Sequence, residues 1–81
     1  MRIQVLYFAS AREAAGCGAE TLDLADGATL REVRDLLGRR HPPLAAAWPA
    51  IRFAVGDRFA ADDRRLAPDD RVALLPPVSG G

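Results

Sequence analysis

The chain has 81 residues, 49% of them hydrophobic and 27% charged, and a formal net charge of zero. This length and composition predict one soluble globular domain, and the balanced charge argues against nucleic acid as the main partner. No apolar run is long enough to span a membrane, and the first residues do not form a secretory signal. The single cysteine, Cys17, cannot form an internal disulfide, so we expect a cytoplasmic protein.

The N-terminal part predicts two strands joined by a helical turn. Side chains of residues 2–8 alternate between a face toward the core and an outward face, which predicts a strand. Phe8 is the last residue on the outward face. Residues 10–15 predict a helical turn with Ser10 as a possible N-cap. Alternation returns over residues 19–24, which would pair antiparallel with the first strand as a hairpin.

The middle of the chain predicts the principal helix. Thr29 and Glu32 fit a T-x-x-E capping box. The apolar residues that follow have helical spacing: Leu30, Val33, Leu36 and Leu37. His41 falls in the last turn, where we expect a favourable positive charge and not a catalytic base. Pro42-Pro43 should prevent the helix from continuing.

The remaining elements are short. Residues 44–49 are compatible with either a helical turn or an apolar loop that packs Trp48 over an edge of the core. Residues 51–55 predict a strand, Gly56-Asp57 a turn and residues 58–60 a partner strand. Residues 71–75 predict the last strand, with Leu75 facing outward.

This order of elements favours an α+β protein with the β-grasp, or ubiquitin-like, fold over residues 1–75. A mixed sheet of about five strands with one main helix on one face buries both apolar faces in so short a chain. The first and last strands would lie parallel and bring Phe8 and Leu75 together. If Phe59 also faces outward, the three form an exposed apolar patch of the kind that marks partner sites. The alternative is that residues 44–49 cover them.

Residues 76–81 form a C-terminal tail. Pro76 and Pro77 cannot donate to a sheet ladder, so they end the last strand. The six residues can extend roughly 20 Å, and Gly80 and Gly81 have no side chain, so they could pass through a narrow channel in a partner. We interpret the terminal carboxylate as functional; the alternative is an idle, frayed tail.

The rest of the chain contains little that could act alone as a catalyst. The sequence has no spacing of histidines, cysteines or carboxylates typical of a metal site, and no phosphate-binding loop. Cys17 has no evident positive neighbour that would lower its pKa. We therefore expect no metal, no cofactor bound by the chain itself and no self-sufficient active site.

Three stretches resemble the sulfur-carrier small subunits of molybdopterin synthase, a ubiquitin-like family. They are FASARE at residues 8–13, AVGD at residues 54–57 and RLAPDDRVALLPPVSGG at residues 65–81, whose P-P-V-x-G-G ending is the most specific mark. The chain departs from the family pattern at three places. It has Leu74-Leu75 where aromatic residues are frequent, Gly56 where Asn is frequent, and Asp69-Asp70 where Gly-Asp is frequent.

The resemblance implies a function for the tail. A ubiquitin-activating-like adenylyltransferase would use ATP to adenylate the carboxylate of Gly81, and a desulfurase- or rhodanese-type donor would supply sulfur to form a thiocarboxylate. The large subunit of molybdopterin synthase would then use this sulfur on cyclic pyranopterin monophosphate. The resemblance assigns the interface to Phe8, Arg12, Phe59 and Leu75. It assigns the threading of the partner to Pro76, Pro77, Val78, Ser79 and Gly80.

Three alternatives use the same sequence features differently. A sulfur carrier for thiazole or for a thiolated tRNA base would share the fold and the activated tail. A ubiquitin-like modifier would instead join Gly81 to lysines of target proteins. A plain binding module would not use its tail at all.

Overall fold

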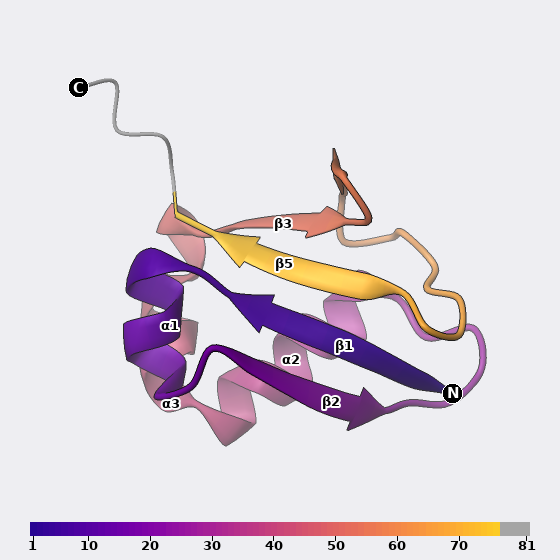
Figure 1. Cartoon of the computed structure of the whole chain (residues 1–81), viewed down its shortest axis with the longest axis horizontal. Helices are drawn as coiled ribbons and strands as arrows, with labels where there is room; N and C mark the ends of the chain where they lie inside the picture. The colour runs from indigo at the N-terminus through magenta and orange to yellow at the C-terminus, as the bar shows by residue number, and fades with distance from the viewer. Residues whose placement is uncertain (77–81) are drawn as a thin grey trace.

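The computed structural model describes residues 1–76, which form a five-stranded mixed sheet with two helices on one face and a third at its end (Figure 1). The elements in chain order are β1 (Arg2–Tyr7), α1 (Ala9–Ala15), β2 (Ala19–Asp23), α2 (Leu30–Arg40), α3 (Pro42–Ala47), the 3-10 helix η1 (Trp48–Ala50), β3 (Arg52–Val55), β4 (Arg58–Phe59) and β5 (Arg71–Leu75). No helix within residues 1–76 is both long and apolar enough to cross a bilayer.

The sheet confirms the predicted β-grasp arrangement. Its strand order is β2-β1-β5-β3-β4, with β1 and β5 parallel and every other neighbouring pair antiparallel. Tyr7 is in register with Leu74, and the N–H of Phe8 donates to the carbonyl of Leu74 at 3.2 Å. The C-terminal ends of the first and last strands therefore lie side by side at one end of the sheet, as expected.

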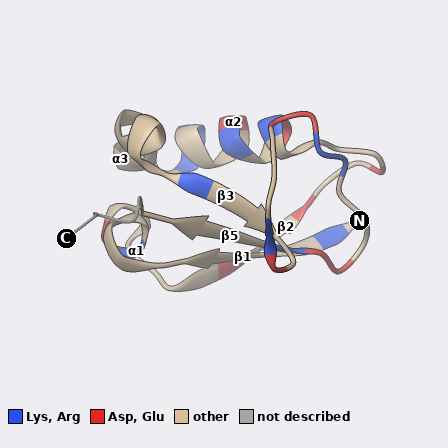
Figure 2. Cartoon of the chain, turned by 90° about the horizontal axis from the view of Figure 1, so that it is seen from above, with Lys and Arg blue, Asp and Glu red and all other residues tan. Residues whose placement is uncertain are grey.

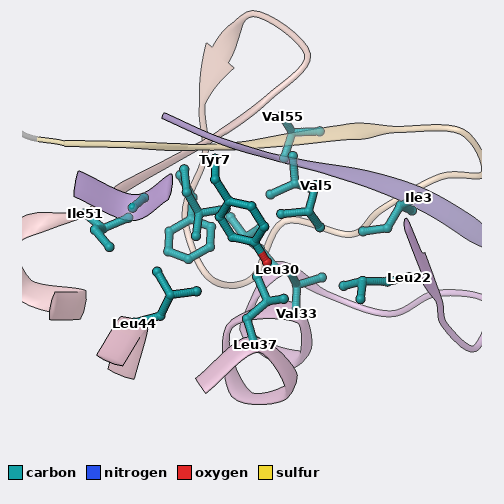
Figure 3. Packing of buried hydrophobic residues seen from close by; sticks show 14 of the residues in the cluster. Ile3, Val5, Tyr7, Leu22, Leu30, Val33, Leu37, Leu44, Ile51 and Val55 are labelled. Atoms are coloured by element: carbon teal, nitrogen blue, oxygen red, sulfur yellow. The ribbon is translucent and has the colours of Figure 1, made fainter. Parts of the chain in front are cut away.

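The core lies between the sheet and the helices. Ile3, Val5 and Tyr7 of β1 point toward α2, as their alternation predicted (Figure 3). The helices contribute side chains that are at most 1% exposed: Leu30, Val33 and Leu37 of α2 and Leu44 of α3. Figure 2 shows α2 and α3 on the same side of the sheet. Within residues 1–76 no helix covers the opposite side, which we call the open face.

The segment that was ambiguous in sequence is helical and lies on the covered side. Pro42 and Pro43 end α2 as predicted, but they also occupy the first turn of α3, where a missing N–H is tolerated. Leu44 is buried in the core, and Trp48 packs on Phe53 with ring centroids 5.5 Å apart. The alternative that residues 44–49 cover the open face is therefore wrong, and the favoured interpretation of an exposed apolar patch holds.

One predicted helix cap is at another residue, and the other is at the predicted residue but lacks its side-chain hydrogen bond. The N-cap of α1 is Phe8 and not Ser10, because α1 begins one residue earlier, at Ala9. Thr29 is the N-cap of α2, but its hydroxyl makes no capping hydrogen bond. Backbone carbonyls of the loop before β5 accept the first helical N–H groups instead, from Leu30 to Arg64 and from Arg31 to Asp62, each at 2.9 Å. A long-range contact thus replaces the local cap.

Candidate functional site

An apolar groove lies on the open face, beside the point where β5 ends. The apolar residues that line it are Leu6, Phe8, Ala54, Phe59, Ala73 and Leu75. Phe8 and Phe59 are 45% and 58% exposed and are the two exposed large hydrophobic side chains among the described residues. Exposing these rings to water is unfavourable, so the groove has the character of a docking surface.

The sequence builds this groove through strand alternation and side-chain size. Ala54 of β3 is in register with Ala73 of β5 and with Phe59 of β4, so these three side chains share the open face. The two alanines form a low floor, whereas Phe8, Phe59 and Leu75 are large. The hollow therefore results from small residues on adjacent strands with large residues around them.

The groove also lies at the base of the tail. Leu75, half-buried, is both a lining residue and the last residue of β5, and Pro76 follows it directly. The structure therefore places Phe8, Phe59 and Leu75 in one groove, as predicted for a partner interface. The roles predicted for Pro77, Val78, Ser79, Gly80 and Gly81 concern residues outside the described part of the chain.

Arg12 does not join this group. It lines a separate hollow with residues around the end of α1, including Glu13 and Cys17. Its guanidinium lies against Gly18, since a Cβ built there would be 3.5 Å from the Arg12 Cζ atom. The interface role of Arg12 stays a prediction, and any partner that contacts both the groove and Arg12 must extend around α1.

Arg52 is a residue beside the groove that sequence reasoning missed; it does not line the groove itself but stacks on Phe59, which does. It lies on β3 in register with Leu75, and its Cζ atom is 4.1 Å from the centre of the Phe59 ring. This is a cation–π contact between two exposed side chains. The available signal was alternation in β3, because Ile51, Phe53 and Val55 face inward and Arg52 must then face outward.

A polar cluster connects β2 to the end of α2 on the covered side. The Glu20 carboxylate accepts from Arg40 Nη1 at 3.2 Å and lies 3.0 Å from His41 Nε2. Burial opposes ionisation of Glu20, but the hydrogen bond and charge of His41, together with Arg40, hold the pKa of this carboxyl below its usual value. His41 is the C-cap of α2, as expected, but its pairing with Glu20 was not predicted.

Tyr7 adjoins this cluster from β1. Its ring meets the His41 ring edge-on, with centroids 6.0 Å apart, and its hydroxyl has no hydrogen-bond partner among the described residues. Burial, and then the charge of Glu20, raise the pKa of Tyr7, so its hydroxyl stays protonated. This arrangement serves the packing of β1, β2 and α2 rather than an open site.

Residues 1–76 hold no group of three or more histidine, cysteine or carboxylate side chains placed to bind a metal ion. Cys17 is a free, half-buried thiol whose Sγ atom lies 3.8 Å from a Glu20 oxygen. Within residues 1–76, the apolar groove is the candidate functional surface.

Comparison with known proteins shows which family the chain belongs to. Residues 5–81 match the family model described as the ThiS family. The chain is 37% identical to the molybdopterin synthase sulfur carrier subunit of Chlamydomonas reinhardtii, with all of both chains aligned. It is 34% identical to the human subunit of the same name, over 99% of this chain and 94% of the relative.

Among solved structures, the small archaeal modifier protein 1 of Haloferax volcanii superposes with a TM-score of 0.85 at 27% identity, over 95% of this chain and 98% of that chain. Both the sequence match and the superposition extend over nearly the whole domain. The β-grasp fold, the groove next to the end of β5 and these alignments all support the same family assignment. The chain belongs to the ThiS family.

Proposed function

We propose that the chain is the sulfur carrier subunit of a molybdopterin synthase. The observation that carries this proposal is the end-to-end alignment with relatives of that name, which includes the Gly80-Gly81 ending. The fold supports it, because an apolar groove lies next to the base of the tail. A sulfur carrier needs both features: a surface that binds the partner and a tail that brings the sulfur to the partner's active site.

The reaction at the tail is an acyl activation followed by sulfur transfer. A carboxylate is a poor electrophile, so an adenylyltransferase of the ubiquitin-activating type joins Gly81 to AMP from ATP and releases pyrophosphate. The terminal sulfur of a persulfide on a desulfurase- or rhodanese-type donor then attacks the carbonyl carbon, AMP leaves, and an acyl disulfide forms. A second thiol attacks the donor-side sulfur and breaks the S–S bond, so that donor and thiol become joined as a disulfide. The product is a thiocarboxylate on Gly81. ATP is bound by the activating enzyme and not by this chain.

The groove and the tail act together on the large subunit. Phe8, Phe59 and Leu75 bury their apolar surface on that partner, which positions the tail at the mouth of its active site. The residues from Pro76 to Ser79 pass along a channel, and Gly80 and Gly81 reach the reacting centre. There the sulfur is donated to cyclic pyranopterin monophosphate, within the cytoplasm.

The direct test is the intact mass of the chain after incubation with the activating enzyme, ATP and a sulfur donor. We expect a gain equal to replacement of one oxygen by sulfur. A variant lacking Gly81 should show no gain, and a variant with one residue added after Gly81 should carry no sulfur at the new terminus while staying folded. Full sulfur transfer by the extended variant would contradict the tail mechanism.

A second candidate function is protein modification, which is favoured by the structural likeness to small archaeal modifier protein 1. In that case the activated Gly81 would form an isopeptide bond with lysines of other proteins. Mass spectrometry of tryptic digests from cells would reveal lysines that carry the C-terminal residues of this chain. A further experiment mixes the thiocarboxylate form of the chain with the large subunit and cyclic pyranopterin monophosphate. Sulfur transfer to that substrate would distinguish a molybdopterin carrier from carriers that serve thiazole or tRNA.

A further inference from the structure

Arg52 is a cation held in a defined position at the edge of the groove. Its guanidinium stacks on Phe59 at 4.1 Å, and Phe59 is itself a lining residue of the groove. Arg52 is in register with Leu75, the last residue before Pro76. The Arg52 backbone therefore lies beside the last residue of β5, and its positive charge lies over the Phe59 ring.

The two charged residues that do line the groove lie at the end away from Leu75. Arg71 begins β5 and Asp57 lies in the turn between β3 and β4, and both line the groove far from Leu75 along the strands. Within residues 1–76, no carboxylate forms an ion pair with Arg52. The groove beside Phe59 is thus positive and apolar.

We propose that Arg52 determines which partner the groove accepts: the large subunit of the synthase, docked with an apolar contact in the groove and a carboxylate paired to Arg52. This inference rests on the proposed function and adds the chemistry of its docking step. Stacking on Phe59 already restricts the guanidinium, so pairing loses less side-chain entropy than it would for a free arginine. Exclusion of water by the apolar contact strengthens the pair.

The same charge discriminates against other partners. A surface that is apolar or basic at this position would bury the Arg52 guanidinium without a counter-charge, which carries a large desolvation penalty. Shape and hydrophobicity alone would let Phe8, Phe59 and Leu75 bind many apolar surfaces. Arg52 adds the requirement that the partner carry a negative charge close to the point where the tail enters it.

The test measures the affinity of the full chain for the large subunit from the same genome, at several salt concentrations. Arg52→Glu should weaken binding on the order of tenfold or more and remove the salt dependence that a rim charge confers. The matched control is Arg39→Glu, an exposed arginine of α2 on the covered side, which should leave affinity within about twofold. Arg52→Lys keeps the charge without the planar fork and should lie between wild type and Arg52→Glu.

Circular dichroism of each variant establishes that it is folded before it is compared. If wild type binds and Arg52→Glu binds equally well, the role of Arg52 is overturned while the carrier function stands. If wild type does not bind the large subunit at all, the proposed function fails and this inference with it. Restoration of Arg52→Glu binding by a basic substitution of a single large-subunit carboxylate would identify the predicted partner group.

Discussion

On the face of the sheet that α2 and α3 cover, Ile3, Val5 and Tyr7 are at most 2% exposed, whereas Phe8 and Phe59 on the open face are 45% and 58% exposed. Both sets lie in segments where apolar residues alternate, so the local sequence pattern does not distinguish them. They differ because helices pack over the first set and no helix among residues 1–76 packs over the second. Covered side chains stabilise the fold, whereas open ones stay available for a partner, and substitutions on the two faces should affect different measurements.

The largest effect is expected for a deletion in the covered core. Leu37→Ala removes a fully buried side chain of α2 and should lower the free energy of unfolding by about 2–5 kcal/mol. Denaturant titration measures this change. Phe59→Ala is the matched control, because it removes a larger but exposed side chain and should change stability by less than about 1 kcal/mol. Equal losses in the two variants would contradict the division between faces.

A charge introduced into the groove should weaken partner binding and have little effect on stability. Leu75→Glu places a carboxylate in an apolar contact and should weaken binding to the large subunit by about 1–3 kcal/mol, a factor of roughly 5 to 150. Its unfolding midpoint should move much less than that of Leu37→Ala. Unchanged affinity in a calorimetric titration would show that Leu75 is not at the interface.

The cluster at Glu20 predicts a pH dependence that belongs to the covered side. The folded state holds the pKa of Glu20 below its ordinary value of 4.5. Ionised Glu20 therefore adds stability that is complete above pH 4.5 and is lost as pH falls through the lower, folded pKa. Glu20→Gln should therefore be less stable than wild type by about 1–2 kcal/mol at neutral pH.

The comparison is made by denaturant titration between neutral and acidic pH. The stability difference between wild type and Glu20→Gln should shrink as pH falls below 4.5. Glu13→Gln, an exposed carboxylate of α1, should show no such convergence. Binding to the large subunit at neutral pH should not change in either variant. A constant difference at every pH would mean that the Glu20 pairing with His41 and Arg40 does not depend on its charge.

The smallest effect is expected at Thr29. Removal of an N-cap hydroxyl typically costs about 1 kcal/mol, but the Thr29 hydroxyl makes no capping hydrogen bond. Thr29→Ala should therefore lower stability by less than about 0.5 kcal/mol. A full capping loss would show that the hydroxyl does cap the helix in solution.

The sequence was sufficient for features that depend on near neighbours. Alternation over residues 2–8 and 71–75 assigned Phe8 and Leu75 to the outward face, and the spacing of Leu30, Val33 and Leu37 identified α2. These predictions held because side-chain direction repeats every two residues in a strand and about every 3.6 in a helix. The β-grasp topology followed from the order of those elements.

Other features required the tertiary structure, because they join residues that are distant in the chain. The stacking of Arg52 on Phe59 depends on the register of β3 with β4, and the pairing of Glu20 with His41 depends on how α2 crosses the sheet. Thr29 is the N-cap of α2 as predicted, but the expected capping hydrogen bond was wrong for the same reason, since carbonyls of Asp62 and Arg64 accept the first helical N–H groups instead.

The sequence by itself thus determined which residues face outward and where the chain ends its last strand. Only the tertiary structure decided that α3 leaves the open face uncovered, that Arg12 lies apart from the groove and that Arg52 lies beside the tail. The physical reason is that periodicity records one residue's orientation relative to its neighbours. The cover over a face and the charge at its edge arise from packing between separate elements, which no local pattern contains.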